Sequence, residues 1–316
     1  MNRPKILLAG FFEDQVRDLA RRFSEADFVA LGDERDIGHH RGDALVTMTQ
    51  PVLDSLFTPD VLDGCRSLRW VHASSAGIDD YLSRLGTTKF IFTCGKIVQG
   101  PPVADHAMAL LLALTRRLPW ALRGIAPSAM PRPTELHGKV ALILGLGGIG
   151  FCIAERAASF GMRVRAVTET KPPILSFVER VHFGDELPVA LPEADVLFIA
   201  APLTPRTRNL LNTEMLGLMK RNSYLINVSR GAIVNLQGLV TTLEQNWFEG
   251  VGLDVSDPEP LAPDHPLRAF ERVIITPHYA GTTTDRERRF DLITTNIRRF
   301  LNGQQLLNVV DKTAGY

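Results

Sequence analysis

The chain has 316 residues, 45% of them hydrophobic, which is enough for two globular domains with buried cores. Its 35 Lys and Arg residues balance its 35 Asp and Glu residues, and this neutrality argues against a nucleic-acid partner or an anionic membrane surface. The three cysteines, Cys65, Cys94 and Cys152, show neither metal spacing nor a disulfide framework. They indicate a reducing, cytoplasmic environment.

The two most apolar segments predict neither a signal peptide nor a membrane span. Acidic Glu13 and Asp14 follow closely on the N-terminal apolar run, so this run predicts a first strand. The later stretch Val103–Leu118 contains Asp105 and Arg116 and is too short and too polar to cross a bilayer. We therefore expect no membrane partner.

In the first hundred residues, short apolar runs alternate with an amphipathic pattern. The segment Glu13–Phe23 places Val16, Leu19 and Phe23 on one helical face. Such alternation of strand and helix predicts a parallel sheet with helices on both faces. The expected strands are Lys5–Gly10, Phe28–Leu31, Ala44–Met48, Leu68–Ala73 and Phe90–Thr93, with a further helix near Val52–Leu56.

A second α/β unit is expected after a helix that opens with Pro101 and Pro102 and continues through Val103–Leu118. The Pro-rich loop Ala126–Pro133 follows, and the second unit begins at Lys139. Its expected strands are Val140–Leu144, Arg163–Val167, Val196–Ala200, Tyr224–Asn227, Gly250–Asp254 and Val273–Thr276. Its expected helices are Ile149–Phe160, Thr213–Leu218 and Leu236–Gln245, before a last helix over Thr282–Phe300 whose N-cap lies in 282–285.

The strand Val140–Leu144 runs directly into a glycine motif with the spacing G-x-G-x-x-G. Gly145 permits the tight turn out of the strand, Gly147 lets the backbone approach a pyrophosphate, and Gly150 lets the next helix lie close to the sheet. The N-terminus of that helix offers free N–H groups and the positive end of its dipole to phosphates. The motif therefore favours dinucleotide binding over an ordinary turn.

Three later segments each follow a predicted strand and carry one chemically active side chain. They contain Arg230, Glu259 and His278. Alone, each is typical of a solvated loop residue. Because ligands of open α/β sheets bind beyond the carboxyl ends of the strands, the three loops are expected to reach one crevice.

These three side chains suit the reduction of a 2-oxo acid. His278 would exchange a proton with the carbonyl oxygen, and Glu259 would orient the imidazole and favour its protonated form. Arg230 would bind the substrate carboxylate through its fork of donors and polarise the carbonyl. A nicotinamide would supply the hydride.

The same segments resemble the D-isomer-specific 2-hydroxyacid dehydrogenases, in particular those like glyoxylate and hydroxypyruvate reductases. The matching motifs are L-H-G-K-V-A-L-I-L-G-L-G-G-I-G (136–150), A-P-L-T-P-R-T-R-N-L-L-N (201–212), N-V-S-R-G-A-I-V-N (227–235), G-V-G-L-D-V-S-D-P-E-P-L (250–261) and T-P-H-Y-A-G-T (276–282). Weaker likenesses lie at 74–80 and 102–114, so the resemblance covers nearly the whole chain.

The resemblance implies an α/β protein with two Rossmann-like, doubly wound parallel-sheet domains and a cleft between them. Residues 1–100 plus 284–316 would form a discontinuous substrate-binding domain, and residues 101–283 the dinucleotide-binding domain. The family is usually dimeric through the region holding Val103–Leu118, so a homodimer is implied. The implied function is NAD(P)-dependent conversion between a short 2-oxo acid and its D-2-hydroxy acid, without a metal.

The resemblance also assigns roles to individual residues. Arg230, Glu259 and His278 would be catalytic, Asp254 would contact the nicotinamide amide, and the Ser75–Ile78 loop would bind the substrate carboxylate through backbone N–H groups. The substrate-binding set is then Ser75, Ala76, Gly77, Ile78 and Arg230. The cofactor-binding set is Gly145, Gly147, Gly148, Ile149, Gly150, Thr168, Glu169, Pro202, Thr207, Val228, Ser229 and Asp254.

The end of the second cofactor strand bears on the choice between NAD and NADP. Thr168 stands where a ribose-binding Asp is common, but Glu169 follows at once, about 20 residues after the glycines. A carboxylate there accepts from the ribose 2′-hydroxyl and repels a 2′-phosphate, which favours NAD. Lys171 could pair with that phosphate instead, so NADP remains open.

Two other functions stay in competition. The C-terminal-binding corepressors resemble this family and keep the same three residues, so a dinucleotide-sensing binding protein is an alternative. A phosphite dehydrogenase-like enzyme is another, since the Thr168-Glu169 pair resembles that branch. For the substrate tail, the candidate pocket residues are Met48-Thr49-Gln50-Pro51, Ser74–Ile78 and Tyr279.

Overall fold

The computed structural model describes residues 3–49, 51–58, 61–62, 65–170, 172, 175–285 and 287–314, apart from the side chains of 34–36. The chain divides into two compact units, one formed by 1–98 and 284–316, the other by 99–283. The expected domain limits were 100/101 and 283/284. The roles expected for the two units, substrate binding and dinucleotide binding, stay predictions.

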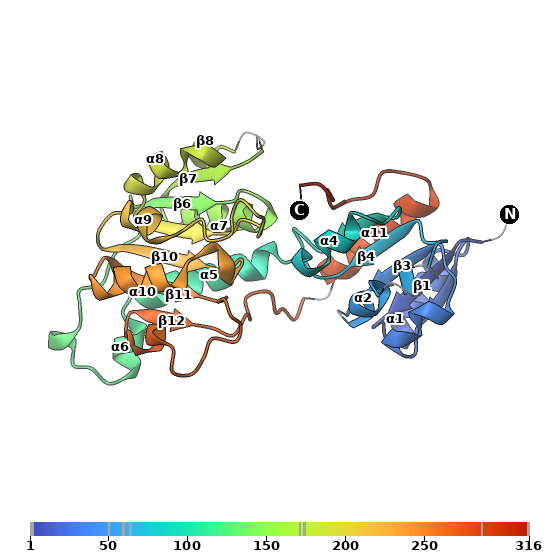
Figure 1. The fold of residues 1–316 in the computed structure, drawn as a ribbon, viewed down its shortest axis with the longest axis horizontal. Coiled ribbons are helices and arrows are strands. Elements are labelled where there is room, and N and C mark those ends of the chain that lie inside the picture. The colour runs from blue at the N-terminus through green and yellow to red at the C-terminus, as the bar shows by residue number, and fades with distance from the viewer. Residues whose placement is uncertain are drawn as a thin grey trace. The chain divides into compact units, whose positions relative to one another are not determined.

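The first unit is built on a parallel sheet in the order β2-β1-β3-β4-β5 (Figure 1). Alternate residues of each strand face opposite sides, so both faces need a helical cover. The strands are β1 (Lys5–Ala9), β2 (Asp27–Ala30), β3 (Ala44–Thr47), β4 (Trp70–Ala73) and β5 (Ile91–Cys94). The helices are α1 (Glu13–Arg22), η1 (Glu34–His39), α2 (Pro51–Leu56), η2 (Asp79–Tyr81), α4 (Leu82–Leu85) and α11 (Glu287–Leu301).

The two faces of this sheet bury separate cores. Ile6 and Leu8 of β1 pack with Ile293 and Ile297 of α11, so the C-terminal helix completes the N-terminal sheet (Figure 1). On the opposite face, strand residues including Leu7 pack against α2 and the η2–α4 segment. The sheet therefore depends on chain ends that are far apart in sequence.

The C-terminal tail also closes the edge of β5. The backbone N–H of Val310 donates to the carbonyl of Phe92 at 2.9 Å, and that of Cys94 to the carbonyl of Asn308 at 3.2 Å. The Lys312 ammonium donates to the carbonyls of Thr88 and Phe90 and to the Thr88 hydroxyl, at 2.7–3.0 Å. Paired edge groups of this kind do not offer a template for aggregation.

The second unit is built on a seven-stranded parallel sheet in the order β12-β11-β10-β9-β6-β7-β8. From β8 to β12 this is the strand order of a dinucleotide-binding fold, with its switch point between β6 and β9. The strands are β6 (Val140–Leu144), β7 (Arg163–Thr168), β8 (Val178–Phe183), β9 (Val196–Ile199), β10 (Ser223–Asn227), β11 (Phe248–Leu253) and β12 (Val273–Ile275).

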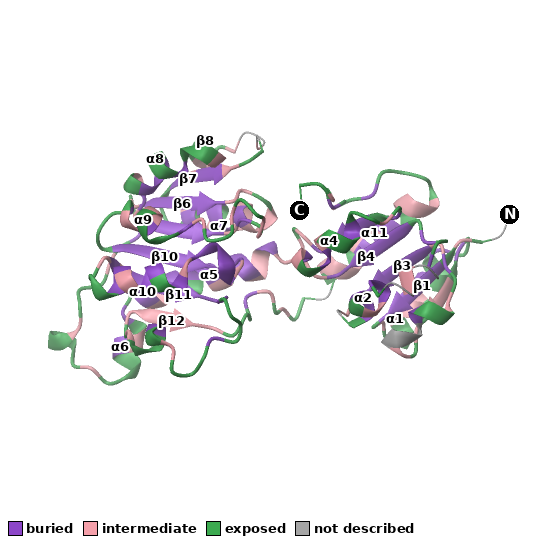
Figure 2. Cartoon of the chain, viewed as in Figure 1, coloured by how far each residue is buried: buried purple, intermediate pink, exposed green. Residues whose placement is uncertain are grey.

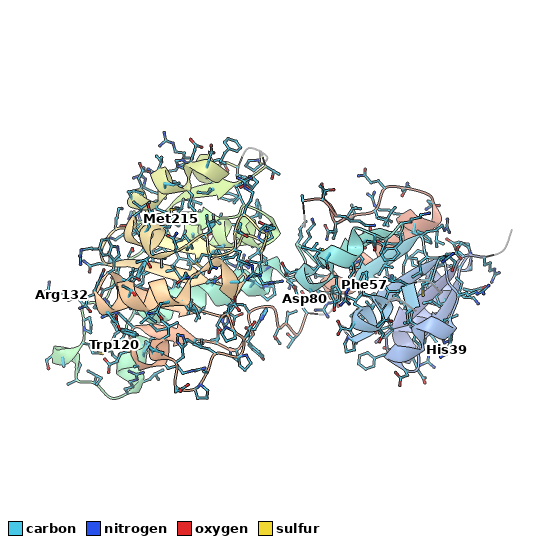
Figure 3. The ribbon with its side chains drawn as sticks, viewed as in Figure 1. His39, Phe57, Asp80, Trp120, Arg132 and Met215 are labelled. Atoms are coloured by element: carbon cyan, nitrogen blue, oxygen red, sulfur yellow. The ribbon has the colours of Figure 1, made fainter. Side chains whose placement is uncertain are left out.

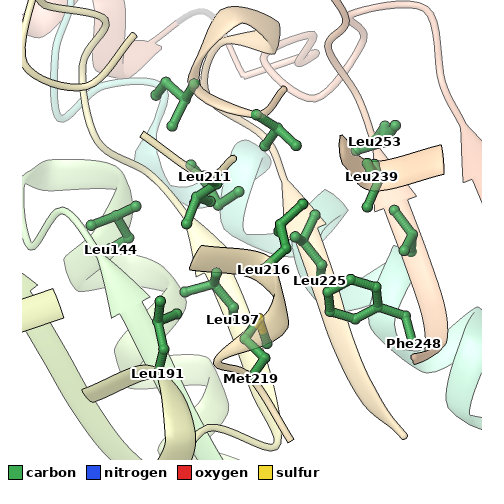
Figure 4. Packing of buried hydrophobic residues seen from close by; sticks show 14 of the residues in the cluster. Leu144, Leu191, Leu197, Leu211, Leu216, Met219, Leu225, Leu239, Phe248 and Leu253 are labelled. Carbon is green, nitrogen blue, oxygen red and sulfur yellow. The ribbon is translucent and has the colours of Figure 1, made fainter. Parts of the chain in front are cut away.

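Helices cover both faces of this sheet. The helices are α5 (Gly100–Thr115), α6 (Leu118–Leu122), η3 (Pro127–Ala129), α7 (Gly148–Ser159), η4 (Gly184–Glu186), α8 (Leu187–Ala190), η5 (Leu191–Glu193), α9 (Thr213–Gly217), η6 (Gly231–Ile233), α10 (Leu236–Glu244) and η7 (Pro266–Ala269). One core joins α5 and α7 to strand residues such as Ile143 and Phe198. The other joins α8, α9 and α10 to residues such as Leu144, Leu197 and Leu225 (Figure 4).

The structure corrects two of the predicted helix limits and contains one strand that was not predicted. The helix expected to reach Leu118 ends at Thr115, because Arg117 adopts a positive φ of 61°. The last helix begins at Glu287, five residues later than expected, and Asp285 accepts from the N–H of Glu287 at 3.1 Å. Strand β8 was not predicted, because it lies at the sheet edge with most of its residues exposed or half-buried (Figure 2).

Strand β4 of the first sheet carries a buried histidine, His72, whose protonation would destabilise the fold. The Trp70 indole N–H donates to the Thr93 hydroxyl oxygen at 2.9 Å, and that hydroxyl lies 2.8 Å from His72 Nδ1. His72 is fully buried, and its Nε2 has no hydrogen-bond partner among the described atoms. Burial, with repulsion from Arg289, lowers the pKa of His72 from 6.5 to about 4.

This histidine should make the first unit acid-sensitive. Between about pH 6.5 and pH 4 the unfolded chain binds a proton at His72 that the folded chain excludes, so stability falls as pH falls, by about 3 kcal/mol near the lower limit. Urea unfolding near neutral pH and at about pH 4.5 should show a smaller loss for His72→Asn than for the wild type. Equal losses in both proteins would remove His72 as the cause.

Candidate functional site

The glycine loop between β6 and α7 has the geometry of a phosphate cradle. Gly145 has a φ of +95°, and a Cβ there would lie 2.6 Å from the backbone of Ala201. A Cβ on Gly150 would overlap the carbonyl oxygen of Gly145, so only glycine lets α7 begin so close to the strand. By contrast, a Cβ on Gly147 would meet nothing within 4 Å.

The residues of this loop fit the pyrophosphate of a dinucleotide. Two glycines are required by the protein itself, whereas Gly147 faces open space where the pyrophosphate of a dinucleotide would come closest to the backbone. The N-terminus of α7, which begins at Gly148, lies beside it and supplies free N–H groups. Gly148 and Ile149 stand in this first turn; the helix was predicted to begin one residue later, at Ile149, and the cofactor contacts of both residues stay predictions.

The neighbouring loop after β9 is folded on itself. The Thr207 hydroxyl donates to the carbonyl of Pro202 at 2.7 Å and accepts from the N–H of Thr204 at 2.8 Å. This turn fixes Pro202 and Thr207, both expected at the cofactor, at the carboxyl edge of the sheet. It also carries Arg206, whose guanidinium lies 3.0 Å from a carboxylate oxygen of Glu169 after β7. Lys171 lies outside the described residues.

The loop after β10 is held by a buried asparagine. Asn227 is fully buried; its side-chain N–H donates to the carbonyl of Arg230 at 3.0 Å, and its oxygen accepts from the N–H of Ser229 at 3.1 Å. The Ser229 hydroxyl donates to the carbonyl of Ala201. Val228 is buried in the same turn. Arg230 is thereby placed at the strand end by groups with little freedom to move.

The proposed acid–base pair is formed in the structure. His278 Nδ1 lies 3.1 Å from a carboxylate oxygen of Glu259, and the two side chains remain 50% and 40% exposed. A neutral imidazole bonded to a carboxylate through Nδ1 carries its hydrogen there and presents Nε2 outward. The pair is therefore arranged to exchange a proton at Nε2.

The position of His278 depends on Asp254, at the end of β11. The Asp254 carbonyl accepts from the N–H of His278 at 2.8 Å. Its carboxylate oxygens accept from the N–H groups of Tyr279 and Ala280, each at 2.9 Å. Three successive backbone donors thus converge on one residue that is only 1% exposed. Asp254 holds the histidine turn, and its expected contact with a nicotinamide amide stays a prediction.

Helix α5 contributes a second layer to this anchor. The Thr276 hydroxyl donates to Asp254 at 2.6 Å, so its own oxygen is free to accept from His106 Nε2 at 2.9 Å. His106 Nε2 also lies 3.3 Å from the Asp254 carboxylate. The histidine turn is therefore tied to the longest helix of its unit.

A close backbone approach links the arginine loop to the glutamate loop. A Cβ on Gly231 would overlap the main chain of Ser256, so any other residue would push the two loops apart. The Ser256 hydroxyl in turn donates to the carbonyl of Pro258, next to Glu259, at 2.8 Å. Because β10, β11 and β12 are neighbouring parallel strands, their three loops share one edge of the sheet.

In the first unit, the loop predicted to bind the substrate carboxylate is anchored by the residue that precedes it. Ser74 is buried, and its N–H and hydroxyl both donate to the carbonyl of Thr47, at 3.1 and 2.8 Å. Ser75, Ala76 and Gly77 are partly exposed, whereas Ile78 is buried. A cavity of about 50 Å³ adjoins this loop, lined by Met48, Thr49, Leu53, Ser74 and Ser75. Tyr279 belongs to the second unit, and Gln50 lies outside the described residues.

Sequence reasoning missed the residues that position the site. Asn227, Thr276, His106 and Arg206 were given no role from the sequence, although all four stand inside the matching motifs, His106 in the weaker one at 102–114. A buried polar residue at a strand end was the available signal, since such a group needs partners. The described residues contain no cluster of three or more metal-binding side chains and no helix long and apolar enough to cross a bilayer.

Comparison with known proteins agrees with this geometry. Residues 108–280 match a family model described as "D-isomer specific 2-hydroxyacid dehydrogenase, NAD binding domain". The glyoxylate reductase of Thermofilum pendens is 32% identical over 283 residues, covering 85% of this chain and 81% of that protein. The glyoxylate reductase of Thermococcus kodakarensis is 34% identical over 335 residues, covering 98% and 97%.

A solved structure is similar along the whole chain. It is a D-isomer specific 2-hydroxyacid dehydrogenase from Xanthobacter autotrophicus Py2 in complex with NADPH and MES, with a TM-score of 0.82, 25% identity and complete coverage of both chains. These similarities confirm the resemblance read from the sequence, the two parallel α/β sheets, and a nicotinamide dinucleotide, NAD or NADP, as cofactor.

The contrast between Gly147 and Gly150 provides a test of the cofactor site. Gly147→Ala should leave the melting temperature unchanged, because its Cβ meets no protein atom, yet raise the dissociation constants of NADH and NADPH about tenfold or more. Isothermal titration calorimetry measures both constants. Gly150→Ala is the control and should lower the melting temperature. Wild-type affinity in Gly147→Ala would place the pyrophosphate elsewhere.

Proposed function

Since the chain belongs to the D-isomer specific 2-hydroxyacid dehydrogenase family, we propose that it reduces a short 2-oxo acid, with glyoxylate as the first candidate, or oxidises the corresponding D-2-hydroxy acid. The observation that carries the proposal is the His278–Glu259 pair, whose side chains lie 3.1 Å apart between two loops on the sheet edge that also carries Arg230. The second unit would bind the dinucleotide and the first the substrate. When bound, the nicotinamide supplies or accepts the hydride.

His278 is the proposed proton carrier. In the reduction its Nε2 would give a proton to the carbonyl oxygen of the substrate, and in the oxidation it would take the proton back. Glu259 stabilises the positive imidazolium and fixes the ring through Nδ1. The backbone hydrogen bonds of His278 and Tyr279 to Asp254 hold the histidine turn in place, so the imidazole needs little reorganisation when it transfers the proton.

Arg230 is the proposed anion and carbonyl binder. One guanidinium nitrogen donates to the carbonyl of Ser229 at 2.8 Å, which fixes the direction of the side chain. A guanidinium has the planar fork of donors that suits a carboxylate. A fixed cation of this kind also stabilises the negative charge that develops on the carbonyl oxygen.

The Ser75–Ile78 loop is the proposed second binder of the substrate carboxylate. Its partly exposed residues, Ser75 to Gly77, follow the buried and anchored Ser74, which fixes where the loop begins. The adjoining cavity of about 50 Å³ lies within the first unit and is lined by Thr49, Ser74 and Ser75 among others. We propose a short substrate because two similar proteins are named glyoxylate reductases.

A homodimer and a cytoplasmic location complete the proposal. Residues 116–135, here called the arm, leave the body of the second unit after α5 and include α6 (Figures 1 and 3). Arg117 fixes the arm, with an ion pair to Glu249 and a 2.8 Å bond to the carbonyl of Arg132. Leu122 on α6 is nevertheless 87% exposed. The free thiols of all three cysteines support a reducing compartment.

The arm offers a surface for a second copy of the chain. At the base of the arm lies a hollow of about 360 Å³, lined by apolar Leu112, Leu136 and Phe160 and by polar residues that include Arg116 and Glu135. An apolar projection next to a partly apolar hollow suits a symmetric interface, in which each copy fills the hollow of the other.

Turnover decides between this proposal and its alternatives. The purified protein should oxidise NADH or NADPH in the presence of glyoxylate, hydroxypyruvate or pyruvate, followed by the near-ultraviolet absorbance of the reduced cofactor. Tight cofactor binding without turnover of any 2-oxo acid would support a dinucleotide-sensing binding protein. Reduction of NAD by phosphite alone would support the phosphite dehydrogenase-like alternative.

Replacement of the proton carrier gives the sharpest mechanistic test. His278→Ala should lower kcat by about a hundredfold or more, with cofactor affinity retained, because the acid–base group is removed while the cofactor loop is untouched. Glu259→Gln should also lower kcat, because the imidazole loses the carboxylate that fixes the ring through Nδ1. His39→Ala, an exposed histidine of the first unit, is the control. A His278→Ala enzyme with near-normal kcat would exclude the proposed mechanism.

The proposed interface is tested by a charge on the arm. Leu122→Asp should weaken self-association at least about tenfold, because a buried leucine is lost and a charge is placed in each half of the interface. Analytical ultracentrifugation over a range of protein concentrations measures the change. Val189→Asp, at a residue of α8 that is 67% exposed, should leave the assembly unchanged. A wild-type monomer, or an unaffected Leu122→Asp dimer, contradicts this surface.

A further inference from the structure

An ion pair lies across the proposed dinucleotide site of the second unit. Glu169 follows β7, and Arg206 belongs to the loop after β9. Strand β6 lies between these two strands in the sheet, and its carboxyl end opens into the glycine loop. The guanidinium of Arg206 and the carboxylate of Glu169 are 3.0 Å apart. The pair therefore joins the loops on either side of the glycine loop.

The glutamate of this pair is held on two sides. Besides its ion pair with Arg206, its carboxylate lies against Gly184 at the start of η4, where a Cβ would overlap a carboxylate oxygen. The carboxylate that the sequence assigned to the ribose 2′-hydroxyl is thus already engaged. An adenosine ribose bound at the end of β7 would meet a neutralised carboxylate and a cation, instead of an isolated negative charge.

The ion pair is weak enough to exchange partners. Its side chains are 73% exposed for Arg206 and 47% exposed for Glu169, and exposed pairs of this kind are easily replaced. A phosphate carries more charge than a carboxylate and accepts two parallel hydrogen bonds from a guanidinium. The 2′-phosphate of NADPH is therefore a better partner for Arg206 than Glu169 is.

We propose that Arg206 allows this chain to bind NADPH as well as NADH, because its guanidinium can turn from Glu169 to the 2′-phosphate of NADPH. With NADH, Arg206 stays on Glu169 or yields that carboxylate to the 2′-hydroxyl. The chain then accepts both cofactors, although Glu169 by itself would reject NADPH. This inference rests on the proposed placement of the dinucleotide along the glycine loop.

Cofactor affinities of single variants test the inference. Arg206→Ala should weaken NADPH binding about tenfold or more, because a charge-assisted bond is lost and the carboxylate regains its full repulsion, while NADH binding changes little or improves. Glu169→Gln should strengthen NADPH binding relative to NADH. Calorimetric titration of the full chain without substrate gives these constants independently of turnover.

The matched control lies two residues away. Arg208 in the same loop is 56% exposed and pairs with Asp257 at 3.7 Å, so Arg208→Ala removes an equal charge without touching Glu169. It should leave the ratio of NADPH to NADH affinity close to that of the wild type. Adenosine 2′,5′-bisphosphate and AMP, titrated as probes of the adenosine half alone, should repeat the selective effect of Arg206→Ala.

Each other outcome is decisive. If Arg206→Ala and Arg208→Ala changed the NADPH affinity equally, Arg206 would act only through the overall charge of the loop. Selective loss of NADPH in Lys171→Ala, with Arg206→Ala unaffected, would move the phosphate contact to Lys171. Both results overturn the inference while both cofactors still bind. If neither cofactor binds the wild-type protein, the proposed function fails instead.

Discussion

The histidine turn depends on one buried carboxylate. Asp254 accepts hydrogen bonds from three successive backbone N–H groups, and its side chain is almost completely buried. A buried carboxylate is costly unless it is satisfied, so this arrangement has one low-energy form and resists alternatives. The Nδ1 contact of His278 with Glu259 is made from that fixed turn. Proton transfer at Nε2, as proposed, requires such a fixed direction.

The other loops of the second unit are placed by backbone contact more than by side chains. Gly150 lets α7 start against the turn at Gly145, and Gly231 lets the arginine loop lie on the main chain at Ser256. Each contact is closer than any Cβ permits. The glycines therefore set the spacing between loops, and the charged residues take their positions from it. Gly147 differs, because the space beside it belongs to no protein atom.

The ion-pair partner of Glu169, the acidic residue after β7, changes what this residue predicts about the cofactor. By itself Glu169 favours NAD, since a carboxylate rejects a 2′-phosphate. In the structure it is paired with Arg206, 37 residues later in the chain. An exposed ion pair contributes little to the free energy of folding, so the pair can separate for a ligand with little loss of stability.

The sequence by itself determined the two α/β units, most strand positions and the motif residues. These follow from local signals: short apolar runs for buried strands, glycines for turns, and charged residues just beyond strand ends. Val140–Leu144 was predicted to the residue. Strand β8 was not predicted, because an edge strand with exposed faces lacks the apolar run that marks a buried strand. The end of α5 escaped too, since nothing local marks the positive φ of Arg117.

Only the tertiary structure decided which side chains share hydrogen bonds. His106 and Thr276 meet at Asp254, and Arg206 meets Glu169. These residues lie in different segments of the chain, and the number of residues between two segments does not tell how far apart they are in space. The sequence supplied the chemical groups of the site, because residue types at strand ends are a local property. Their partners were set by strand order, which brings the ends of neighbouring parallel strands to one edge.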